Sequence, residues 1–550
     1  MRNNEIKEQK SMWLVRHQTV LVSIILIIIA GCSTSHIEEE ANNKAMIMGL
    51  DKIDTVQLSE HSVSSPVTVE QATEEITQQV TDSNESQQTI TLSLEQVREA
   101  ALANNLDLKV ELVDPSIVQT ALDEERAKFE AAFFGSAETQ RSKTATAVTK
   151  TQDYELSIEK PLPTGGLIEV GLPFGDDMSS GGVADAAASV SVIQSLLRGA
   201  GTRINTQSIR IAGHERNIIN ARTKLVAIYL LASADIAYWR LYAARKELDV
   251  RREQYKLAQD QLNHAKKKVA AGSAAKIEIV RAEAGLSGRL EAVINAETTV
   301  LNRTRDIQRI MNRDDMPLEA VVDIVTQTEP NPLGLGLDER QLTEQALSNR
   351  MEMVELELQL TIDELNVELA RNNTLPDLAL NYTYAAQAQE STIGGALGDL
   401  TDNPFDSHSV GLSVAVPLGN RVAKARLQRA QLLKMQDQVR RNRLQQLIRQ
   451  EVYNAVSELR GNWRRILAAE QGVTAAYRDY KVEQSQFQLG VRTSTDVLYS
   501  ATRLADAQLG RIRAFTDYEI AQIYLAQATG TLLGKGQIQI ASVDIDDSLP

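Results

Sequence analysis

Residues 409–420 read Ser-Val-Gly-Leu-Ser-Val-Ala-Val-Pro-Leu-Gly-Asn, and the change of pattern that decides the fold occurs within them. Apolar and polar residues alternate over 409–416, which predicts a β-strand with two chemically different faces. Pro417 and Gly419 then break the pattern. No proline occurs from Asn420 to Leu489, so these roughly 70 residues are predicted to form one helix about 105 Å long. The sequence thus predicts strands that lead directly into very long helices.

The long helical segment occurs twice. In each copy apolar residues recur every seven positions, and every member of the first series has a counterpart 218 positions later: Leu241, Leu248, Tyr255, Leu262 and Val269 correspond to Leu459, Ile466, Val473, Tyr480 and Phe487. The same offset relates Gly272 to Gly490, which mark turns before a returning helix. It also relates Glu278 to Asp496. A register kept over so many positions indicates a tandem duplication.

The spacing of seven indicates helices that twist around one another. Taken alone, it is more typical of a soluble coiled-coil rod. Strand-like segments at 378–384, 154–158 and 167–172 favour another architecture, because a rod has no use for strands in both repeats. We expect four strands from the first unit and two from the second, and it stays open whether the additional hairpin lies outside the barrel that such strands would form. Aromatic residues of these segments are candidates for a membrane-interface girdle or for packing in the wall: Phe133, Phe134, Phe174, Tyr382 and Tyr384.

The N-terminus has the features of an export signal. Basic residues precede an apolar run, Val20 to Ala30, that ends at Ile29-Ala30-Gly31-Cys32. An aliphatic residue, two small residues and a cysteine resemble the bacterial lipoprotein signal, in which the cysteine is acylated and becomes the first mature residue. Cys32 is the single cysteine of the chain, so it has no disulfide partner. Ser33 follows it, which in lipoproteins suggests sorting to the outer membrane; the alternative is an ordinary signal peptide with a chance cysteine.

Composition excludes several classes of function. The formal net charge of −15 gives no support to a nucleic-acid partner. The histidines lack metal-ligand spacing, and no Ser-His-Asp set, phosphate-binding loop or HExxH motif occurs. We therefore expect no enzyme, no metal and no cofactor. Beyond the N-terminal run, no segment reaches the roughly 18 consecutive apolar residues of a transmembrane helix, so a further membrane crossing requires a β-barrel.

These patterns divide the chain into six segments. We expect a lipoprotein signal peptide at 1–31, a lipidated and mostly disordered tether at 32–90, a first repeat at 91–312, an inter-repeat linker at 313–336, a second repeat at 337–533 and a C-terminal tail at 534–550. In the first repeat the strands are expected within about 131–197 and the long helices within 202–312. In the second they are expected within about 377–418 and 420–533.

Three motifs carry a resemblance to a known family. They are Gln194-Ser195-Leu196-Leu197-Arg198-Gly199-Ala200-Gly201, Val416-Pro417-Leu418 and Phe487-Gln488-Leu489-Gly490-Val491-Arg492-Thr493-Ser494-Thr495-Asp496-Val497-Leu498. The first two resemble the strand-to-helix junctions of the TolC-like outer-membrane efflux family, and the third resembles the tip between its long periplasmic helices. Together with the duplication, the resemblance covers roughly Leu92 to Leu533.

The resemblance implies a mainly α-helical fold with a membrane β-barrel. Long antiparallel helices from the two repeats would form a trimeric α-barrel tunnel, and strands from three protomers would close one β-barrel. Short elements at 313–337 and in the tail would form an equatorial belt. The implied partners are two further copies of the chain, a periplasmic adaptor, an inner-membrane pump and the lipid of the outer membrane.

The resemblance also implies a gate at the periplasmic end. Arg492 corresponds to an arginine that links neighbouring helix pairs, while Asp496 and Glu278 correspond to acids at the constriction. Three copies of Asp496 around one axis would attract cations. Phe487 replaces a gating tyrosine and Tyr499 replaces a second acid, so packing should replace part of the hydrogen bonding. An ordinary surface pair between Arg492 and Asp496, four residues apart, is the alternative. The tip turns expected to dock an adaptor contain Gly272, Gly490, Val491 and Thr493.

We therefore expect a lipid-anchored outer-membrane channel that extends into the periplasm and serves as the exit duct of a tripartite export system. A duct for type I protein secretion is the alternative within the family. A structural coiled-coil lipoprotein of the envelope is the alternative from another class.

Overall fold

The computed structural model describes residues 88–144, 148–177, 183–402, 404–489 and 491–535. All of them belong to one compact unit, residues 75–550. Cys32, the predicted signal peptide at 1–31 and nearly all of the predicted tether lie outside the described residues, and so does Gly490. The first described residues, 88–92, form a strand of a small sheet, although the segment 32–90 was expected to be a tether.

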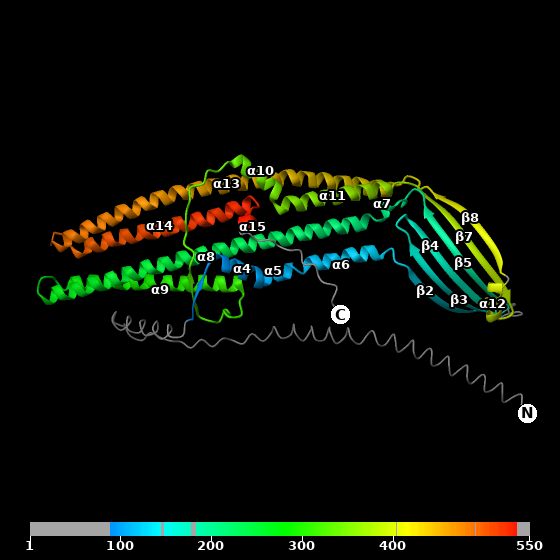
Figure 1. Cartoon of the computed structure of the whole chain (residues 1–550), viewed down its shortest axis with the longest axis horizontal. Coiled ribbons are helices and arrows are strands. Elements are labelled where there is room, and N and C mark those ends of the chain that lie inside the picture. The colour runs from blue at the N-terminus through cyan, green and yellow to red at the C-terminus, as the bar shows by residue number, and fades with distance from the viewer. Residues whose placement is uncertain (1–87, 145–147, 178–182, 403, 490, 536–550) are drawn as a thin grey trace, which may run out of the picture. The chain divides into compact units, whose positions relative to one another are not determined.

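A six-stranded antiparallel sheet stands at one end of the described unit (Figure 1). Four strands come from the first repeat and two from the second: β2 (Ala132–Lys143), β3 (Val148–Pro161), β4 (Gly166–Asp177), β5 (Val183–Ser195), β7 (Asp377–Glu390) and β8 (Phe405–Ala415). Their order in the sheet is β2-β3-β4-β5-β7-β8. The two repeats therefore meet where β5 pairs with β7, from Ala184 opposite Glu390 to Ser195 opposite Ala379.

The register gives the sheet two chemically different faces. Residues opposite each other in an antiparallel pair point to the same side. One row therefore contains Phe133, Ile158, Val170, Val190 and Tyr384, and the row beside it contains Ser157 and Ser189. We call the side of Phe133 the apolar face. Large apolar side chains that are exposed on it include Phe133, Leu156, Ile158, Val170, Val190, Leu380, Tyr382, Val410, Leu412 and Val414. The other side, the polar face, carries mostly serine, threonine, asparagine, glutamine and acidic residues.

One short helix covers part of the apolar face. α12 (Ile393–Asp402) connects β7 to β8 and packs through Ala396 on Ala184 and Ala186, with Phe174 beside them. It lies at the end of the sheet farthest from the long helices (Figure 1). Of the predicted aromatic residues, Phe134 points to the polar face, because it is the neighbour of Phe133 in β2.

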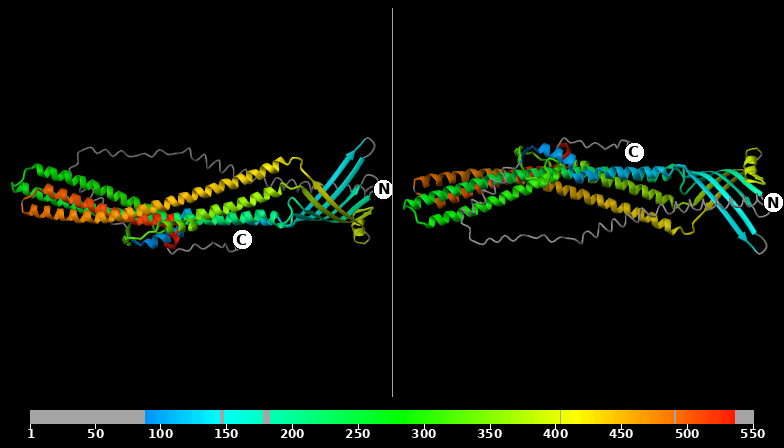
Figure 2. Two further views of the ribbon diagram at one scale, coloured as in Figure 1. Left: turned by 90° about the horizontal axis from the view of Figure 1, so that it is seen from above. Right: turned by 90° about the horizontal axis from the view of Figure 1, so that it is seen from below.

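The helices form a wall that is four helices wide. Next to the sheet the order is α6 (Asp114–Ala127), α8 (Gln207–Ala270), α11 (Met351–Asn372) and α13 (Arg421–Gln488). Toward the tips, α9 (Ile277–Met311) takes the place of α6 and α14 (Ser494–Ala528) takes the place of α11. Figure 2 shows the two long hairpins, α8 with α9 and α13 with α14, running away from the sheet.

Heptad residues lie between the helices of each hairpin. Leu241, Leu248 and Leu262 on α8 are buried, and so are Leu459 and Ile466 on α13. The helix predicted from residue 202 is interrupted at Thr206, which is not helical, so that α7 (Thr202–Asn205) is a separate turn. The hydroxyl of Thr206 donates a hydrogen bond to the carbonyl of Thr202 (2.7 Å), as threonine often does where a helix is irregular.

Short elements gather around the middle of α8 and α13. Strand β1 (Gln88–Leu92) pairs in parallel with β6 (Val322–Thr326) of the inter-repeat segment. Tyr238 of α8 is fully buried; its hydroxyl accepts a hydrogen bond from the amide of Thr328 (2.7 Å) and lies 3.2 Å from the carbonyl of Leu92. The remaining helices of this region are α4 (Leu94–Asn104), α5 (Leu106–Glu111), α10 (Glu339–Asn349) and α15 (Leu532–Lys535).

Among the residues that the structure describes, α8 alone contains a stretch long and apolar enough to span a membrane, with a mean hydropathy of 1.2. Inside the protein 61% of that stretch is buried, as expected of a helix in the core.

Candidate gate at the helix tips

Both hairpins turn with the same hydrogen bond. At the first tip the amide of Ser273 donates to the carbonyl of Lys268 (2.9 Å), and Gly272 adopts a left-handed conformation with a φ of 69°. At the second tip the amide of Val491 donates to the carbonyl of Gln486 (2.9 Å). These bonds have the six-to-one spacing of a Schellman motif, which ends a helix where glycine takes positive φ.

Thr493 and Asp496 together cap the start of α14. The Thr493 hydroxyl accepts a bond from the amide of Asp496 (3.3 Å), and the Asp496 carboxylate accepts bonds from the amide (3.0 Å) and the hydroxyl (2.8 Å) of Thr493. This reciprocal arrangement is a capping box. The bonds from the Thr493 amide and hydroxyl hold the pKa of the Asp496 carboxyl below its usual range. Asp496 is therefore expected to stay ionised at the tip.

Within one chain, the contacts of Arg492 are with residues of its own hairpin. Its Nε donates a hydrogen bond to Oε1 of Gln486 (3.0 Å) and lies 3.3 Å from Oε2 of Glu483, forming an ion pair with it. Both partners belong to α13, so within one chain Arg492 folds back over the end of its own hairpin. The capping bonds from Thr493 both go to Oδ2 of Asp496. Glu278 instead pairs with Arg281 on its own helix, at 2.9 Å.

Aromatic residues at the tip contact cations. The Lys268 ammonium lies 4.4 Å from the ring centre of Phe487, which joins the end of α8 to the end of α13. The Arg503 guanidinium lies 5.1 Å from the ring of Tyr499 and forms an ion pair with Asp479 of α13. A cation is attracted to the negative face of an aromatic ring. Phe487 and Tyr499 therefore contribute to electrostatic contacts at the tip through their rings.

A further bond ties the returning helices to each other. Arg289 of α9 donates to the hydroxyl of Thr502 on α14 (2.7 Å). Gly285 of α9 lies against Leu498 of α14: a methyl group at position 285 would be 3.8 Å from Cδ2 of the leucine, which is ordinary van der Waals contact. The two hairpins are thus linked near the tips by Arg289 and by Lys268, two residues outside the motif that pointed to a gate.

The gate residues predicted from the sequence therefore lie at one end of the fold but form two groups. Thr493, Asp496, Val491 and Arg492 surround the second turn, whereas Gly272 and Glu278 belong to the first. The capping box has a sequence signal, threonine followed three residues later by an acid before an apolar run. The contacts between the hairpins have none, because their partners are far apart in the chain.

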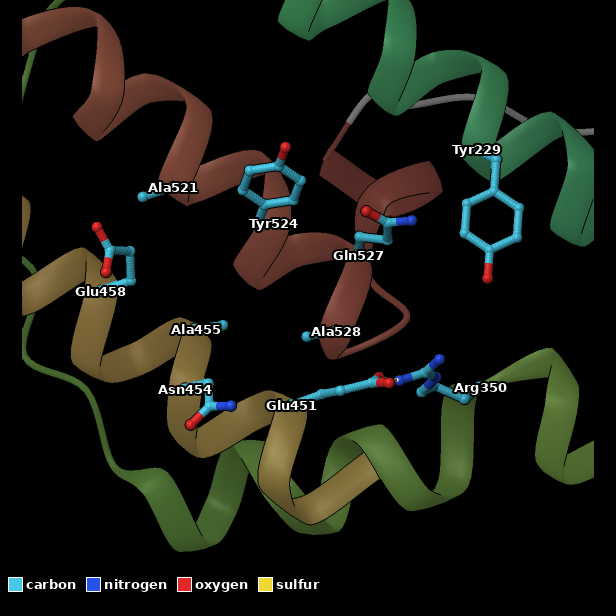
Figure 3. A pocket seen from close by; sticks show the side chains of 10 residues that line it. All are labelled: Tyr229, Arg350, Glu451, Asn454, Ala455, Glu458, Ala521, Tyr524, Gln527 and Ala528. Atoms are coloured by element: carbon cyan, nitrogen blue, oxygen red, sulfur yellow. Dashed lines mark hydrogen bonds and ion pairs between the residues drawn. The ribbon is translucent and has the colours of Figure 1, made fainter. Parts of the chain in front are cut away.

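A second polar cluster lies where the wall changes helices. Here α14 ends and α11 begins, and a cavity of about 500 Å³ is lined by residues of α8, α13 and α14 and by Arg350 (Figure 3). Arg350, which precedes α11, is largely buried and forms ion pairs with Glu352 and with Glu451 of α13. Burial raises the pKa of the Glu352 carboxyl, but the bonds from Arg350 outweigh burial and leave that pKa below its usual value. The ion pairs of Arg350 therefore join the start of α11 to α13.

Comparison with known proteins bears on the class of this fold. Residues 342–531 match the family model described as outer membrane efflux protein. The chain is 24% identical over 307 residues to the outer membrane protein TolC of Vibrio cholerae serotype O1, covering 54% of this chain and 66% of that protein. It is 22% identical over 307 residues to the outer membrane efflux protein BepC of Brucella suis biovar 1, covering 55% and 63%. The chain thus spans slightly less than two thirds of each of these relatives.

Among solved structures, the fold resembles the CmeC outer membrane channel of Campylobacter jejuni with a TM-score of 0.61, at 14% identity over 83% of this chain and 90% of that one. The fold is therefore similar to that of this channel, and the second repeat resembles the outer membrane efflux protein family.

Proposed function

We propose that this protein is the outer-membrane exit duct of a tripartite efflux system. Three copies form one tunnel, which receives substrate from an inner-membrane pump through a periplasmic adaptor and releases it outside the cell. The observation that carries the proposal is a two-faced sheet joined directly to a wall of long helices. A duct needs both parts, one to cross the membrane and one to cross the periplasm.

The two faces of the sheet support a location in the outer membrane. Exposed valine, leucine, isoleucine and aromatic side chains in such number are unfavourable in water but suit contact with lipid. Val410, Leu412 and Val414 on β8 are each about 70% exposed on the apolar face. The polar face, with Glu138, Asp153 and Asp185 on three strands, suits a water-filled interior. Alternation of this kind is the pattern of strands in a membrane barrel.

The edges of the chain support assembly from several copies. β2 and β8 each lack a partner on one side, and unpaired strand edges are not tolerated in lipid. The outer helices of the wall carry exposed apolar side chains, among them Val113 and Ile117 before and within α6 and Val422, Met435 and Val439 on α13. Pairing β8 of one copy with β2 of the next, and α13 with α6 and α9, satisfies both requirements. Closure with three copies rests on the family resemblance.

In this assembly the helix tips form the gate and the docking site. Three Asp496 carboxylates would surround the axis at the constriction, and Arg492 would hold each second hairpin in its closed position. Gly272, Gly490, Val491 and Thr493 would present the turns to the adaptor, while Glu278, Phe487 and Tyr499 would pack between hairpins. Cys32 would carry the lipid anchor in the outer membrane.

The proposal is tested on the full-length protein extracted from outer membranes in detergent. We expect an oligomer of three chains whose mobility changes on heating, and discrete conductance steps after insertion into planar bilayers. A Cys32→Ser variant should lose incorporation of radiolabelled palmitate, and the adaptor and pump should co-purify with the native protein. A helical monomer or dimer without conductance, as a coiled-coil rod would give, overturns the proposal.

A further inference from the structure

The six-stranded sheet bears on the size of the duct. The hairpin β3–β4 lies inside the sheet: β3 pairs with β2 from Val148 to Glu159, and β4 pairs with β5 from Gly166 to Asp177. β2 and β5 pair with this hairpin and not with each other, so the six strands form one continuous sheet.

The inserted hairpin also has the same two faces as the rest of the sheet. Leu156 and Ile158 of β3 and Val170 of β4 lie on the apolar face, in rows with Val190 of β5 and Tyr384 of β7. Glu155 and Glu169 point to the polar face. A hairpin folded outside a barrel in water would have no reason to match its neighbours on both sides. The side chains of β3 and β4 thus suit the same surroundings as those of β5 and β7.

The width of the helical wall agrees with six strands. Four helices packed about 8–10 Å apart make a wall roughly 32–40 Å wide. Six strands spaced about 4.8 Å apart and tilted by about 35–45° occupy roughly 35–41 Å of circumference. Four strands with the same tilt would occupy only about 23–27 Å. The six-stranded sheet and the helical wall therefore have about the same width.

We infer that three copies of this chain close a barrel of 18 strands, with the polar face inside and the β3–β4 hairpin in the wall of each copy. The inference rests on the proposed function. The circumference corresponds to a backbone diameter of about 35 Å, and barrels of about this many strands leave an open aqueous channel. The membrane segment of the duct is then wide enough to carry bulky solutes without narrowing below the helical tunnel.

Single cysteines in intact outer membranes test this inference. Glu155→Cys and Leu156→Cys report on the two faces of β3, and Asn381→Cys and Tyr382→Cys report on the same faces of β7. Each full-length variant is treated with a membrane-impermeant maleimide, and labelling of the parent chain gives the background from Cys32. We expect position 155 to label several-fold faster than position 156, and position 381 several-fold faster than position 382.

Two other outcomes would separate failure of this inference from failure of the proposed function. Fast labelling at both 155 and 156, with alternation kept at 381 and 382, would place the hairpin in water outside the barrel and overturn the inference while leaving the proposed duct intact. Loss of alternation in β7 as well would mean that the sheet does not face lipid at all, and the proposed function itself would fail. A density map of the purified trimer with 12 strands would also overturn the inference.

Discussion

Asp363 on α11 and Asp437 on α13 face each other as two buried carboxyl groups in the wall beside the sheet. Asp437 is paired with Arg440 at 2.6 Å, whereas Asp363 has only a long contact with Gln359 at 3.5 Å, and its Oδ2 has no hydrogen-bond partner. Burial and the neighbouring carboxyl of Asp437 both raise the pKa of Asp363, which Arg440 only partly opposes. A proton shared by the two carboxyl groups would let one of them donate a hydrogen bond to the other.

The raised pKa makes the stability of the wall depend on pH. The folded chain holds the Asp363 proton more tightly than the unfolded chain, so the stabilising effect of that proton is lost as pH rises through the folded pKa. We expect Asp363→Asn to raise the thermal midpoint at neutral pH and to flatten its pH dependence above pH 4. Glu364→Gln is the matched control, since Glu364 is exposed and pairs with Lys434 between the same helices. Equal effects of the two substitutions would show that no shared proton exists.

Arg98 on α4 and Asp235 on α8 form a bidentate ion pair with both contacts at 2.7 Å, and Asp235 is 1% exposed. Removing one member of a buried pair leaves an uncompensated charge. We expect Arg98→Ala to lower the free energy of unfolding by about 3 kcal/mol, measured with denaturant. The double variant Arg98→Met, Asp235→Leu should recover much of the loss. As a control, Arg340→Ala removes an exposed pair with Glu344 and should cost less than about 0.5 kcal/mol.

The capping box gives a local prediction at the second tip. Thr493→Ala removes the cap of α14 and should weaken its first turn by about 1 kcal/mol. Amide hydrogen exchange should then speed up at the start of α14 while the middle of the helix is unchanged. Thr474→Ala, which removes a hydroxyl bonded to the carbonyl of Glu470 within α13, should leave exchange at the tip unaltered. Uniform exchange in both variants would contradict a capping role for Thr493.

The ion pair of Arg492 with Glu483 leads to a prediction about gating. Arg492→Ser frees the end of the second hairpin, so we expect conductance in planar bilayers to rise several-fold. Glu483→Gln should give a smaller increase, because Arg492 keeps its bond to Gln486. Arg281→Ser at the same end removes a pair within α9 only and should leave conductance unchanged. Unchanged conductance in Arg492→Ser would show that Arg492 takes no part in gating.

The sequence predicted the large features because they depend on repeated local patterns. Spacing by seven located Leu241 and Leu459 in buried positions, and alternation located the strands from both repeats. The break of the first helix at Thr206 was missed because nothing in the neighbouring sequence forbids helix. The link of Arg492 to neighbouring helix pairs stays a prediction, and its contacts with Glu483 and Gln486 within the hairpin had no signal in the sequence. Contacts such as Arg289 with Thr502 depend on how two distant hairpins pack, which no local pattern encodes.

Strand β1 fastens the N-terminal end of the fold to the middle of the helical wall, where Leu92 lies against Tyr238. Tyr238 is 31 residues along α8 from its start beside the sheet, a distance of about 45 Å. The chain therefore enters the described fold far from the sheet, and a pull on it from the N-terminal side would load the β1–β6 hydrogen bonds before it reached either the sheet or the long hairpins.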